Sequence, residues 1–269
     1  NAFAPVSRDP GRYLAAVRRN GEVNNWRPGT RPLCADDHAI TQSYFMLHRV
    51  EPDPKIIQPA LDTLSQIRLF PYDESLEFED WEKTWRQWTW CDALFMSPPA
   101  LALAATATGD RAYLDFMNKM WWKTTDYLYD RDEHLYYRDS RFFDERSANG
   151  RKIFWSRGNG WVLAGLARVL QEMPADYPHR PRYLKLYREM AEKVAAIQST
   201  LALSGSLSSA GPAKMDKSAM TPTSMATTSL YRRGSISLVG SMPVKTHHPS
   251  GSTGTTEVCS LDARKNWRM

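Results

Sequence analysis

The sequence predicts an all-α protein built from helical hairpins, and two observations lead to this prediction. Between residues 35 and 198, apolar side chains recur every three to four positions, which is the spacing of a helix with one buried face. The segments with this spacing also come in pairs, with no strand-rich or βαβ section between them. Consecutive hairpins of this kind fit a bundle, a solenoid or a toroid, and the periodicity alone leaves all three open.

The first predicted hairpin joins residues 37–50 to residues 54–70. The first helix places four apolar side chains on one face: Ile40, Tyr44, Leu47 and Val50. The second helix repeats the pattern with Ile57, Leu61, Leu64 and Ile67. Pro54 suits the first turn of this second helix, because the amide that proline lacks has no partner there.

The second predicted hairpin begins with an alanine-rich helix over residues 98–108, which Gly109 is expected to end. Asp110 follows directly and is expected to cap a long helix over residues 111–130. A connector rich in aromatic and charged side chains then runs from residue 127 to residue 155 without predicted secondary structure. A connector of this length is more often functional than idle.

A third hairpin is predicted over residues 161–173 and 181–198, with Pro174 after its first helix. After Gln198 the composition changes, because serine and threonine become frequent while acidic residues and tryptophan become rare. We therefore expect a helical domain over residues 1–198. Residues 199–269 are expected to be a low-complexity tail or a frame-shifted translation, without a domain of their own.

Composition excludes several other classes of protein. The net charge of +5 is not accompanied by a Lys/Arg-rich run or a nucleic-acid motif, so no nucleic-acid partner is predicted. No apolar run approaches the roughly 20 residues of a membrane span. The three cysteines are far apart and lack metal-ligand spacing, so we expect buried free thiols and no metal site. No cofactor is expected either. No serine lies in a nucleophile-elbow context, which argues against a hydrolytic triad.

Two short motifs each place one ionisable side chain among large aromatic residues. Asp92 lies two residues after Trp90, and Arg157 lies between Trp155 and Trp161. Apolar walls with a few placed polar groups are typical of a ligand pocket. The two motifs together therefore predict a carbohydrate active site.

Asp92 is the candidate general acid. Its aromatic neighbours would remove water from the carboxyl group, which raises its pKa towards the neutral range where a general acid works. The alternative is structural, since an aspartate just before a helix that begins with proline often caps that helix.

Arg157 is the candidate ligand of a carboxylate, because a guanidinium binds a planar carboxylate with two parallel hydrogen bonds. Gly158 and Gly160 are expected to let the backbone approach a sugar closely, and Trp161 offers a flat apolar face for a ring.

Four motifs in order give the sequence a family resemblance. They are Ala35-Asp36-Asp37-His38, Trp90-Cys91-Asp92-Ala93-Leu94-Phe95-Met96, Leu135-Tyr136-Tyr137-Arg138-Asp139-Ser140-Arg141 and Trp155-Ser156-Arg157-Gly158-Asn159-Gly160-Trp161. Over residues 24–198 the chain resembles the unsaturated rhamnogalacturonyl hydrolases of pectin degradation. The resemblance implies an (α/α)6 toroid of six hairpins with the pocket at one end, and this chain accounts for about half of that ring.

The resemblance also implies a reaction and a set of site residues. The family hydrates the double bond of a 4,5-unsaturated galacturonic acid and so releases it from a rhamnogalacturonan oligosaccharide. Asp92 would transfer the proton, and Asp36 would be the second carboxylate, which positions water or substrate. The substrate contacts would come from six further residues: Arg157, Trp161, Arg138, Asp37, His38 and Trp90.

Several alternatives stay open. Asp36 or Asp37 could cap the helix that starts near His38, and Arg138 could form a surface salt bridge. An unsaturated glucuronyl hydrolase would share the fold and the chemistry. A truncated, inactive fragment that binds acidic sugar weakly is a further alternative, because the C-terminal residues depart from the family pattern. The oligomeric state is open, and so is the choice between bacterial cytoplasm and periplasm.

Overall fold

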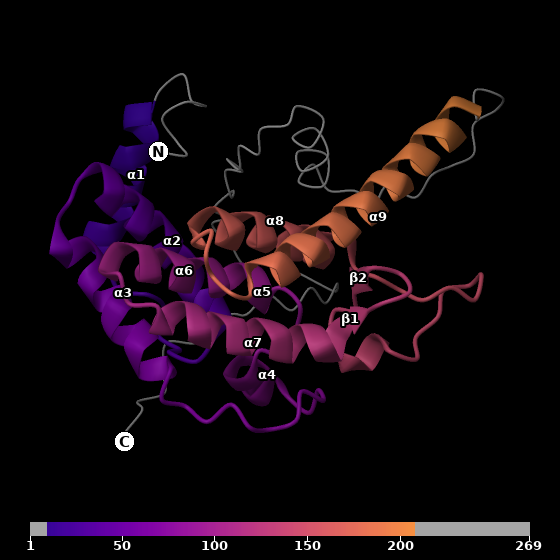
Figure 1. Cartoon of the computed structure of the whole chain (residues 1–269), viewed down its shortest axis with the longest axis horizontal. Helices are drawn as coiled ribbons and strands as arrows, with labels where there is room; N and C mark the ends of the chain where they lie inside the picture. Colours follow the sequence, from indigo (N-terminus) through magenta and orange to yellow (C-terminus); the bar gives the residue numbers. More distant parts are fainter. Residues whose placement is uncertain (1–9, 208–269) are drawn as a thin grey trace, which may run out of the picture. The chain divides into compact units, whose positions relative to one another are not determined.

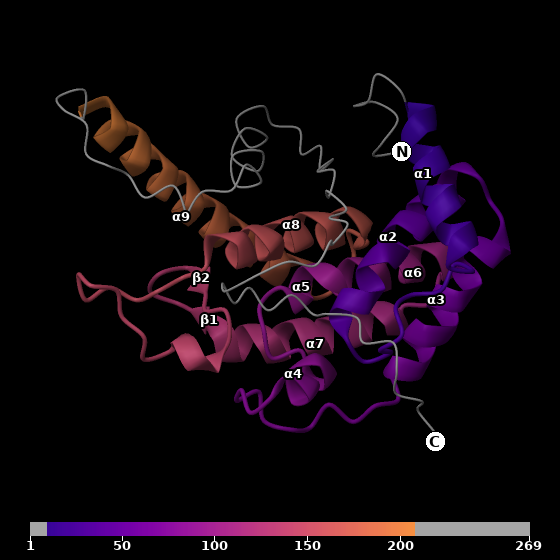
Figure 2. The same ribbon diagram turned by 180° about the vertical axis from the view of Figure 1, so that it is seen from behind.

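A computed structural model gives the backbone of residues 10–207 and the side chains of residues 11–198, which all lie within one compact unit (Figures 1 and 2). The helices are α1 (Pro10–Val23), α2 (Ala35–Val50), α3 (Pro54–Ile67), α4 (Trp81–Gln87), α5 (Ala93–Met96), α6 (Pro98–Thr108), α7 (Ala112–Leu128), α8 (Ser156–Glu172) and α9 (Arg180–Leu207). A small antiparallel hairpin joins β1 (Tyr129–Asp130) to β2 (Leu135–Tyr136), with Tyr129 opposite Tyr136. A short 3-10 helix, η1, spans Ser140–Phe142.

The three predicted hairpins are confirmed. Helix α2 packs against α3, α6 against α7, and α8 against α9. The Asp53 carboxylate accepts a hydrogen bond from the Lys55 amide at the start of α3, and Pro54 occupies the first position of that helix. Gly109 ends α6 in the left-handed conformation with φ of 75°, which a residue without a side chain adopts readily. The Asp110 carboxylate accepts from the Ala112 amide at the start of α7.

The helices form two layers. Helices α2, α5, α6 and α8 contact one another, whereas α1, α3, α7 and α9 each pack against one member of that inner group. Helix α6 lies at the centre and is buried along most of its length, since Ala and Leu from residue 100 to residue 105 exclude solvent on every side. The aspartate and arginine motifs therefore begin inner helices, which brings them to a common region.

Several boundaries differ from the sequence prediction. Helix α8 begins at Ser156, so Arg157 lies in its first turn instead of in the preceding connector. Helix α9 continues to Leu207, beyond the predicted end at Gln198. The connector after α7 contains β1, β2 and η1, because strands of two residues are too short to give a periodic signal. Residues 208–269 lie outside the described residues, so the tail and its frame-shifted origin stay predictions.

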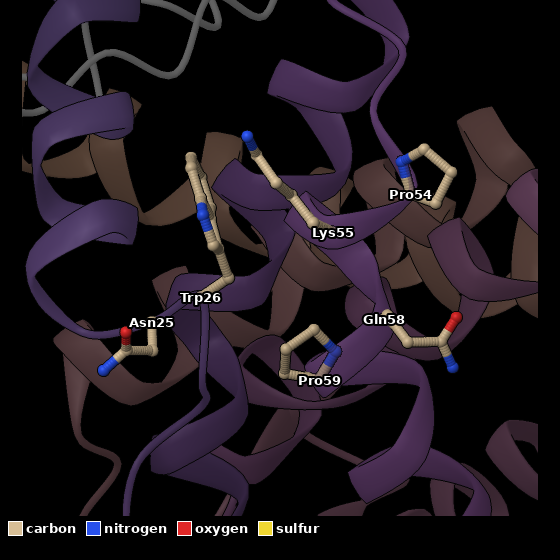
Figure 3. Close-up of a pocket in the computed structure, with 6 residues that line it drawn as sticks. All are labelled: Asn25, Trp26, Pro54, Lys55, Gln58 and Pro59. Atoms are coloured by element: carbon tan, nitrogen blue, oxygen red, sulfur yellow. The ribbon is translucent and has the colours of Figure 1, made fainter.

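An open hollow of about 500 Å³ lies between the turn after α1 and the start of α3 (Figure 3). It is lined by Asn25, Trp26, Pro54, Lys55, Gln58 and Pro59. Lys55 is paired with Asp53, and none of these side chains comes from the two aromatic motifs. The hollow therefore does not coincide with the predicted site, and its lining contains no carboxylate, histidine, serine or cysteine side chain.

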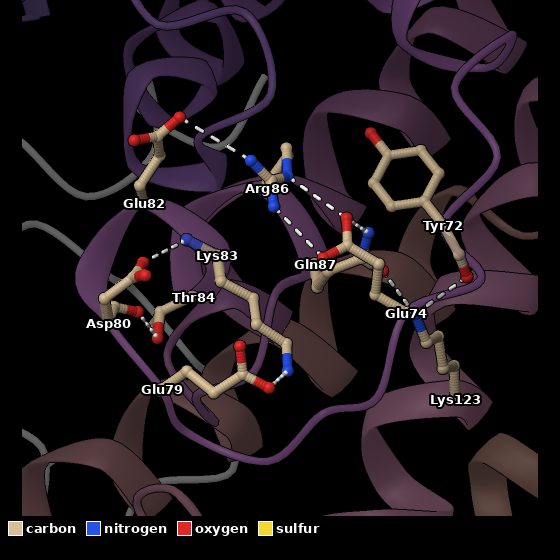
Figure 4. A network of polar contacts seen from close by, with 10 residues as sticks. All are labelled: Tyr72, Glu74, Glu79, Asp80, Glu82, Lys83, Thr84, Arg86, Gln87 and Lys123. Atoms are coloured by element: carbon tan, nitrogen blue, oxygen red, sulfur yellow. Dashed lines mark hydrogen bonds and ion pairs between the residues drawn. The ribbon is translucent and has the colours of Figure 1, made fainter.

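A polar network fixes the short helix α4 to its surroundings (Figure 4). Arg86 forms a two-bond fork with Glu74, at 3.2 and 3.0 Å. Lys123 on α7 donates to the Tyr72 carbonyl oxygen at 2.8 Å and to Gln87 Oε1 at 2.6 Å, and its burial lowers the pKa of the ammonium group to about 8. This network holds residues 72–87 against α7 and thereby supports Trp88 and the aspartate motif that follows.

No helix in the part of the chain described here has the length and apolar character required to cross a lipid bilayer.

Candidate active site

Four segments converge on Asp92. The Cys91 amide donates a 2.9 Å hydrogen bond to the Arg138 carbonyl oxygen, which ties the connector after β2 to the start of α5. The first turn of α8 approaches so closely that a Cβ atom on Gly158 would lie 3.0 Å from Asp92 Oδ1. Asp36, in the first turn of α2, is close enough for its charge to act on the Asp92 carboxyl group. The structure thus brings together the motifs that the sequence separates by some 120 residues.

Asp92 is a buried carboxyl group with a raised pKa. Only 7% of the residue is exposed, and this burial raises the pKa of Asp92 from 3.8 to about 7. The Asp36 charge also raises the pKa, while the Cys91 thiol and the positive charges of Arg157 and Arg138 oppose the rise. Near neutral pH the group is therefore divided between its two protonation states, as a general acid requires. The capping alternative is wrong, because the helix that begins with proline, α6, has Ser97 at its N-cap, and the Asp92 side chain makes no cap hydrogen bond to α5 either.

Gly158 sets the distance between α8 and Asp92. A Cβ atom there would lie 2.7 Å from both Cys91 Sγ and Trp155 Cε3. The close approach that this glycine permits is therefore between α8 and the aspartate motif. A Cβ on Gly160, by contrast, would meet no atom within 4 Å, so that side of α8 faces open space.

Arg157 and Trp161 lie on the first turns of α8. The Arg157 side chain is exposed, and its guanidinium carbon lies 4.4 Å from the centre of the Trp155 ring, a cation–π contact that orients the cation. Trp161 packs against Phe95 with 4.5 Å between ring centres. An exposed, oriented guanidinium beside a buried neutral acid can bind a carboxylate while the acid delivers a proton.

Arg138 lies in an aromatic cluster. Its guanidinium carbon is 5.4 Å from the Trp155 ring centre, with the rings of Trp81 and Phe142 at 5.5 and 5.9 Å. Its Nε is also 3.7 Å from Asp139 Oδ2, so the ion pair considered for Arg138 exists. Its partner is 99% buried and is held more closely by Arg141, so this is not an ordinary surface salt bridge.

Asp36 and Asp37 have different surroundings, although they are adjacent. Asp37 accepts hydrogen bonds from the Arg31 amide at 2.7 Å and from its guanidinium at 2.5 Å. These bonds fix the loop before α2, and they commit the Asp37 carboxylate to the protein. Neither aspartate caps α2, because that helix begins at Ala35 after Cys34, so the capping alternative is wrong for both.

His38 and Trp90 are both buried. His38 is fully buried, with Nε2 at 2.7 Å from the Pro32 carbonyl oxygen and Nδ1 at 2.8 Å from Ser97 Oγ. Burial lowers the pKa of His38 to about 4, so the ring is neutral. Since the carbonyl oxygen can only accept, Nε2 carries the hydrogen and Nδ1 accepts from Ser97. The full burial of His38 does not agree with a direct substrate contact, whereas Trp90 is 7% exposed, as Asp92 is, and its contact stays a prediction.

Sequence reasoning gave no role in the site to Cys91 or Asp139, and it named Trp155 only as an aromatic neighbour of Arg157. Cys91 was expected only as a buried free thiol, which it is. Trp155 belongs to the same motif as Arg157, but the sequence does not show that its ring is the one that contacts the Arg157 guanidinium. Among the described residues, no group of three or more His, Cys, Asp or Glu side chains could hold a metal ion.

Comparisons with known proteins agree with the four motifs. The sequence profile of Glycosyl Hydrolase Family 88 matches residues 8–204. An unsaturated 3S-rhamnoglycuronyl hydrolase of Formosa agariphila is 40% identical over 196 residues, which cover 69% of this chain and 52% of that protein. The chain thus spans about half the length of this relative.

Solved structures give the same picture of the fold. A glycosyl hydrolase family 88 protein from Bacteroides vulgatus superposes with a TM-score of 0.61 at 26% identity, over 71% of this chain and 56% of that one. A structure described as a polysaccharide lyase superposes with a TM-score of 0.60 at 28% identity, over 69% of this chain and 54% of that one. The predicted fold class, a toroid of helical hairpins of which this chain covers a part, is confirmed.

Proposed function

This chain belongs to Glycosyl Hydrolase Family 88, and from that premise we propose that it releases a 4,5-unsaturated uronic acid from an oligosaccharide by hydrating the double bond. The observation that carries the proposal is the buried Asp92 carboxyl group, whose pKa of about 7 keeps a proton available beside the exposed Arg157. By the family resemblance of the four motifs, the natural substrate would be galacturonic acid at the end of a rhamnogalacturonan fragment.

The resemblance implies that this sugar is the non-reducing end of the oligosaccharide and that rhamnose is its neighbour.

The proposed reaction begins with proton transfer. The Asp92 carboxyl group donates its proton to carbon 4 of the enol ether, and the positive charge that develops at carbon 5 is shared with the ring oxygen. Water then adds to carbon 5, and the Asp92 carboxylate takes up the proton that this water loses, which restores the acid. The resulting hemiketal opens by breaking the bond between carbon 5 and the ring oxygen. The open form is a hemiacetal at carbon 1, and its collapse to the aldehyde releases the remaining sugar.

The other charged residues would bind and orient the substrate. Arg157 would form the two-bond fork with the uronate carboxylate, and the aromatic cluster around Arg138 would add a second cation on the same side. Asp36 would position the attacking water, since its charge already acts on Asp92. Trp161 would contact a sugar ring through the part of its surface that Phe95 leaves uncovered.

The unsaturated sugar is the same whether it derives from galacturonic or from glucuronic acid. Galacturonic and glucuronic acid differ only in the configuration at carbon 4, and that centre is lost when carbon 4 joins the double bond. The rhamnogalacturonyl and glucuronyl alternatives therefore share the sugar next to Asp92 and differ in the linkage and in the neighbouring residue. The name of the Formosa agariphila relative, a rhamnoglycuronyl hydrolase, supports rhamnose as that neighbour.

An absorbance assay tests the proposed reaction, because the conjugated double bond absorbs in the ultraviolet. With unsaturated oligosaccharides from rhamnogalacturonan, hydration removes the absorbance, and reaction in ¹⁸O water places the label at carbon 5. Ordinary glycoside hydrolysis would place the label at carbon 1 and leave the double bond intact. Oligosaccharides from a glucuronyl-rhamnose polymer and from a glycosaminoglycan, assayed in parallel, identify the preferred neighbouring sugar.

The same assay separates the competing functions. A polysaccharide lyase would act on the saturated polymer and increase the absorbance. An inactive fragment would bind the unsaturated oligosaccharide without changing its absorbance. Either of these last two results would contradict the proposed hydration.

The matched variants are Asp92→Asn and Asp132→Asn. We expect Asp92→Asn to abolish the loss of absorbance while substrate still binds, because only proton delivery is removed. Asp132 lies exposed in the turn between β1 and β2, so Asp132→Asn should react like the unaltered chain. If Asp92→Asn retains activity within about tenfold, or about 1.4 kcal/mol of barrier, Asp92 is not the acid.

A further inference from the structure

Cys91 lies where three segments of the site meet. It is fully buried, and its amide donates to the Arg138 carbonyl oxygen at 2.9 Å. Its sulfur lies against the first turn of α8, where a Cβ on Gly158 would come within 2.7 Å of Sγ. Its thiol also donates to Asp92 Oδ1, with 3.5 Å between sulfur and oxygen. With its backbone tied to the connector and its sulfur between α8 and Asp92, the side chain has little freedom to leave the carboxyl group.

The thiol remains protonated under ordinary conditions. Burial raises the pKa of the Cys91 thiol well above its ordinary value, and the neighbouring charges of Asp92 and Asp139 raise it further. A protonated thiol can donate a hydrogen bond, and Asp92 Oδ1 is the acceptor within reach. In a neutral carboxyl group the oxygen that accepts a hydrogen bond is the carbonyl oxygen, so the proton is carried by the other one.

We propose that Cys91 is a positioning residue whose thiol holds Oδ1 of Asp92 as an acceptor and thereby keeps the transferable proton on Oδ2. The inference rests on the proposed function only in that the proton is taken to be the one transferred to the substrate. The contact itself does not depend on that function. The other charged groups that act on Asp92 are Asp36 from α2, Arg157 from α8 and Arg138 from the connector after β2.

Infrared spectroscopy of the full chain tests the contact without any substrate. The S–H stretching band of a thiol moves to lower frequency when the thiol donates a hydrogen bond. The band of Cys91 is identified by subtracting the spectrum of Cys91→Ala. We expect it to move to higher frequency in Asp92→Leu, which has no acceptor, and to move to lower frequency as Asp92 ionises around pH 7. The band of the other described thiol, identified with Cys34→Ala, serves as the control and should not follow the Asp92 titration.

Carboxyl NMR of Asp92 tests the consequence for the acid. A donor to the charged form stabilises it, so Cys91→Ala should raise the Asp92 titration midpoint by about half a pH unit. Cys91→Ser keeps a donor of similar size and should restore the midpoint or lower it. The alkaline limb of kcat/KM should move with the midpoint in the active enzyme.

The possible outcomes separate this inference from the proposed function. A Cys91 band that stays in place in Asp92→Leu overturns the contact, whether or not the chain hydrates its substrate. Equal midpoints in Cys91→Ala and Cys91→Ser would reduce Cys91 to a packing residue and also overturn the inference. If both spectroscopic changes occur in a chain that does not hydrate unsaturated uronates, the contact stands and the proposed function fails.

Discussion

At the scale of single residues, the site depends on a contrast between two neighbouring ionisable groups. Asp92 is buried and its pKa is raised to about 7, whereas the Arg157 side chain is exposed above the Trp155 ring. Burial disfavours the charged form of an acid, because that form loses its hydration, so the neutral form is favoured. An exposed cation keeps its hydration and attracts an anionic ligand at long range. The two groups thus suit the transfer of a proton to a substrate that carries a carboxylate.

Arg157→Lys tests the second half of this contrast. Lysine keeps the charge but cannot form the two parallel bonds of a guanidinium, so the variant should bind the unsaturated uronate about tenfold more weakly. The fold should be unchanged, because the Arg157 side chain is exposed. Affinities for the uronate and for its methyl ester, measured by calorimetry, provide the readout.

Arg151→Lys is the matched control, because Arg151 is exposed in the connector and should not affect either affinity. If Arg157→Lys discriminates between acid and ester as well as the unaltered chain does, the carboxylate is bound elsewhere.

At the scale of elements, the paired long helices were predictable from the sequence, whereas the short helices and strands between them were not. The pairs α2/α3, α6/α7 and α8/α9 were predictable because their helices carry long apolar stripes, except α6, which was recognised by its alanine-rich sequence. Helices α4 and α5 are too short to show a period, and the strands of two residues shorter still. Asp92, Asp36 and Arg157 were predictable as neighbours from the motifs. The burial of His38 was not, because a histidine next to two aspartates gives no sign of which face it occupies.

Gly158→Ala tests how closely α8 must approach the aspartate motif. Alanine normally favours a helix over glycine by up to about 1 kcal/mol. Here its Cβ would lie 2.7 Å from Cys91 Sγ and from Trp155 Cε3, so we expect a net loss of about 1–3 kcal/mol in the free energy of unfolding. Urea unfolding followed by circular dichroism measures the change.

Gly160→Ala is the matched control on the same helix, because its Cβ would meet no atom within 4 Å. It should leave the free energy of unfolding unchanged or raise it by up to about 1 kcal/mol. Equal effects of the two substitutions would show that α8 does not press against Cys91.

At the scale of the whole molecule, two buried groups make stability depend on pH in opposite directions. The pKa of Asp92 is raised from 3.8 to about 7, so between these values the folded chain keeps a proton that the unfolded chain releases, and stability falls as pH rises. The pKa of His38 is lowered from 6.5 to about 4, so between these values the unfolded chain binds a proton that the folded chain does not, and stability falls as pH falls. The two windows overlap almost completely, so their contributions largely cancel.

Single variants should uncover each contribution between pH 4.5 and 6.5. In Asp92→Asn only the His38 contribution remains of the two. The free energy of unfolding of this variant should therefore rise with pH, by about 2 kcal/mol over this range relative to the unaltered chain. Glutamine at position 38 can keep hydrogen bonds to Pro32 and Ser97, which His38 contacts. The free energy of unfolding of His38→Gln should instead fall as pH rises, by a similar amount. The double variant should recover the shallow pH profile.

Other carboxylates do not interfere in this pH range. Asp53 and Asp130 have a lowered pKa, so their protonation affects stability only at lower pH. Urea unfolding at several pH values gives these slopes, and parallel profiles for the two single variants would show that neither group changes its protonation on folding.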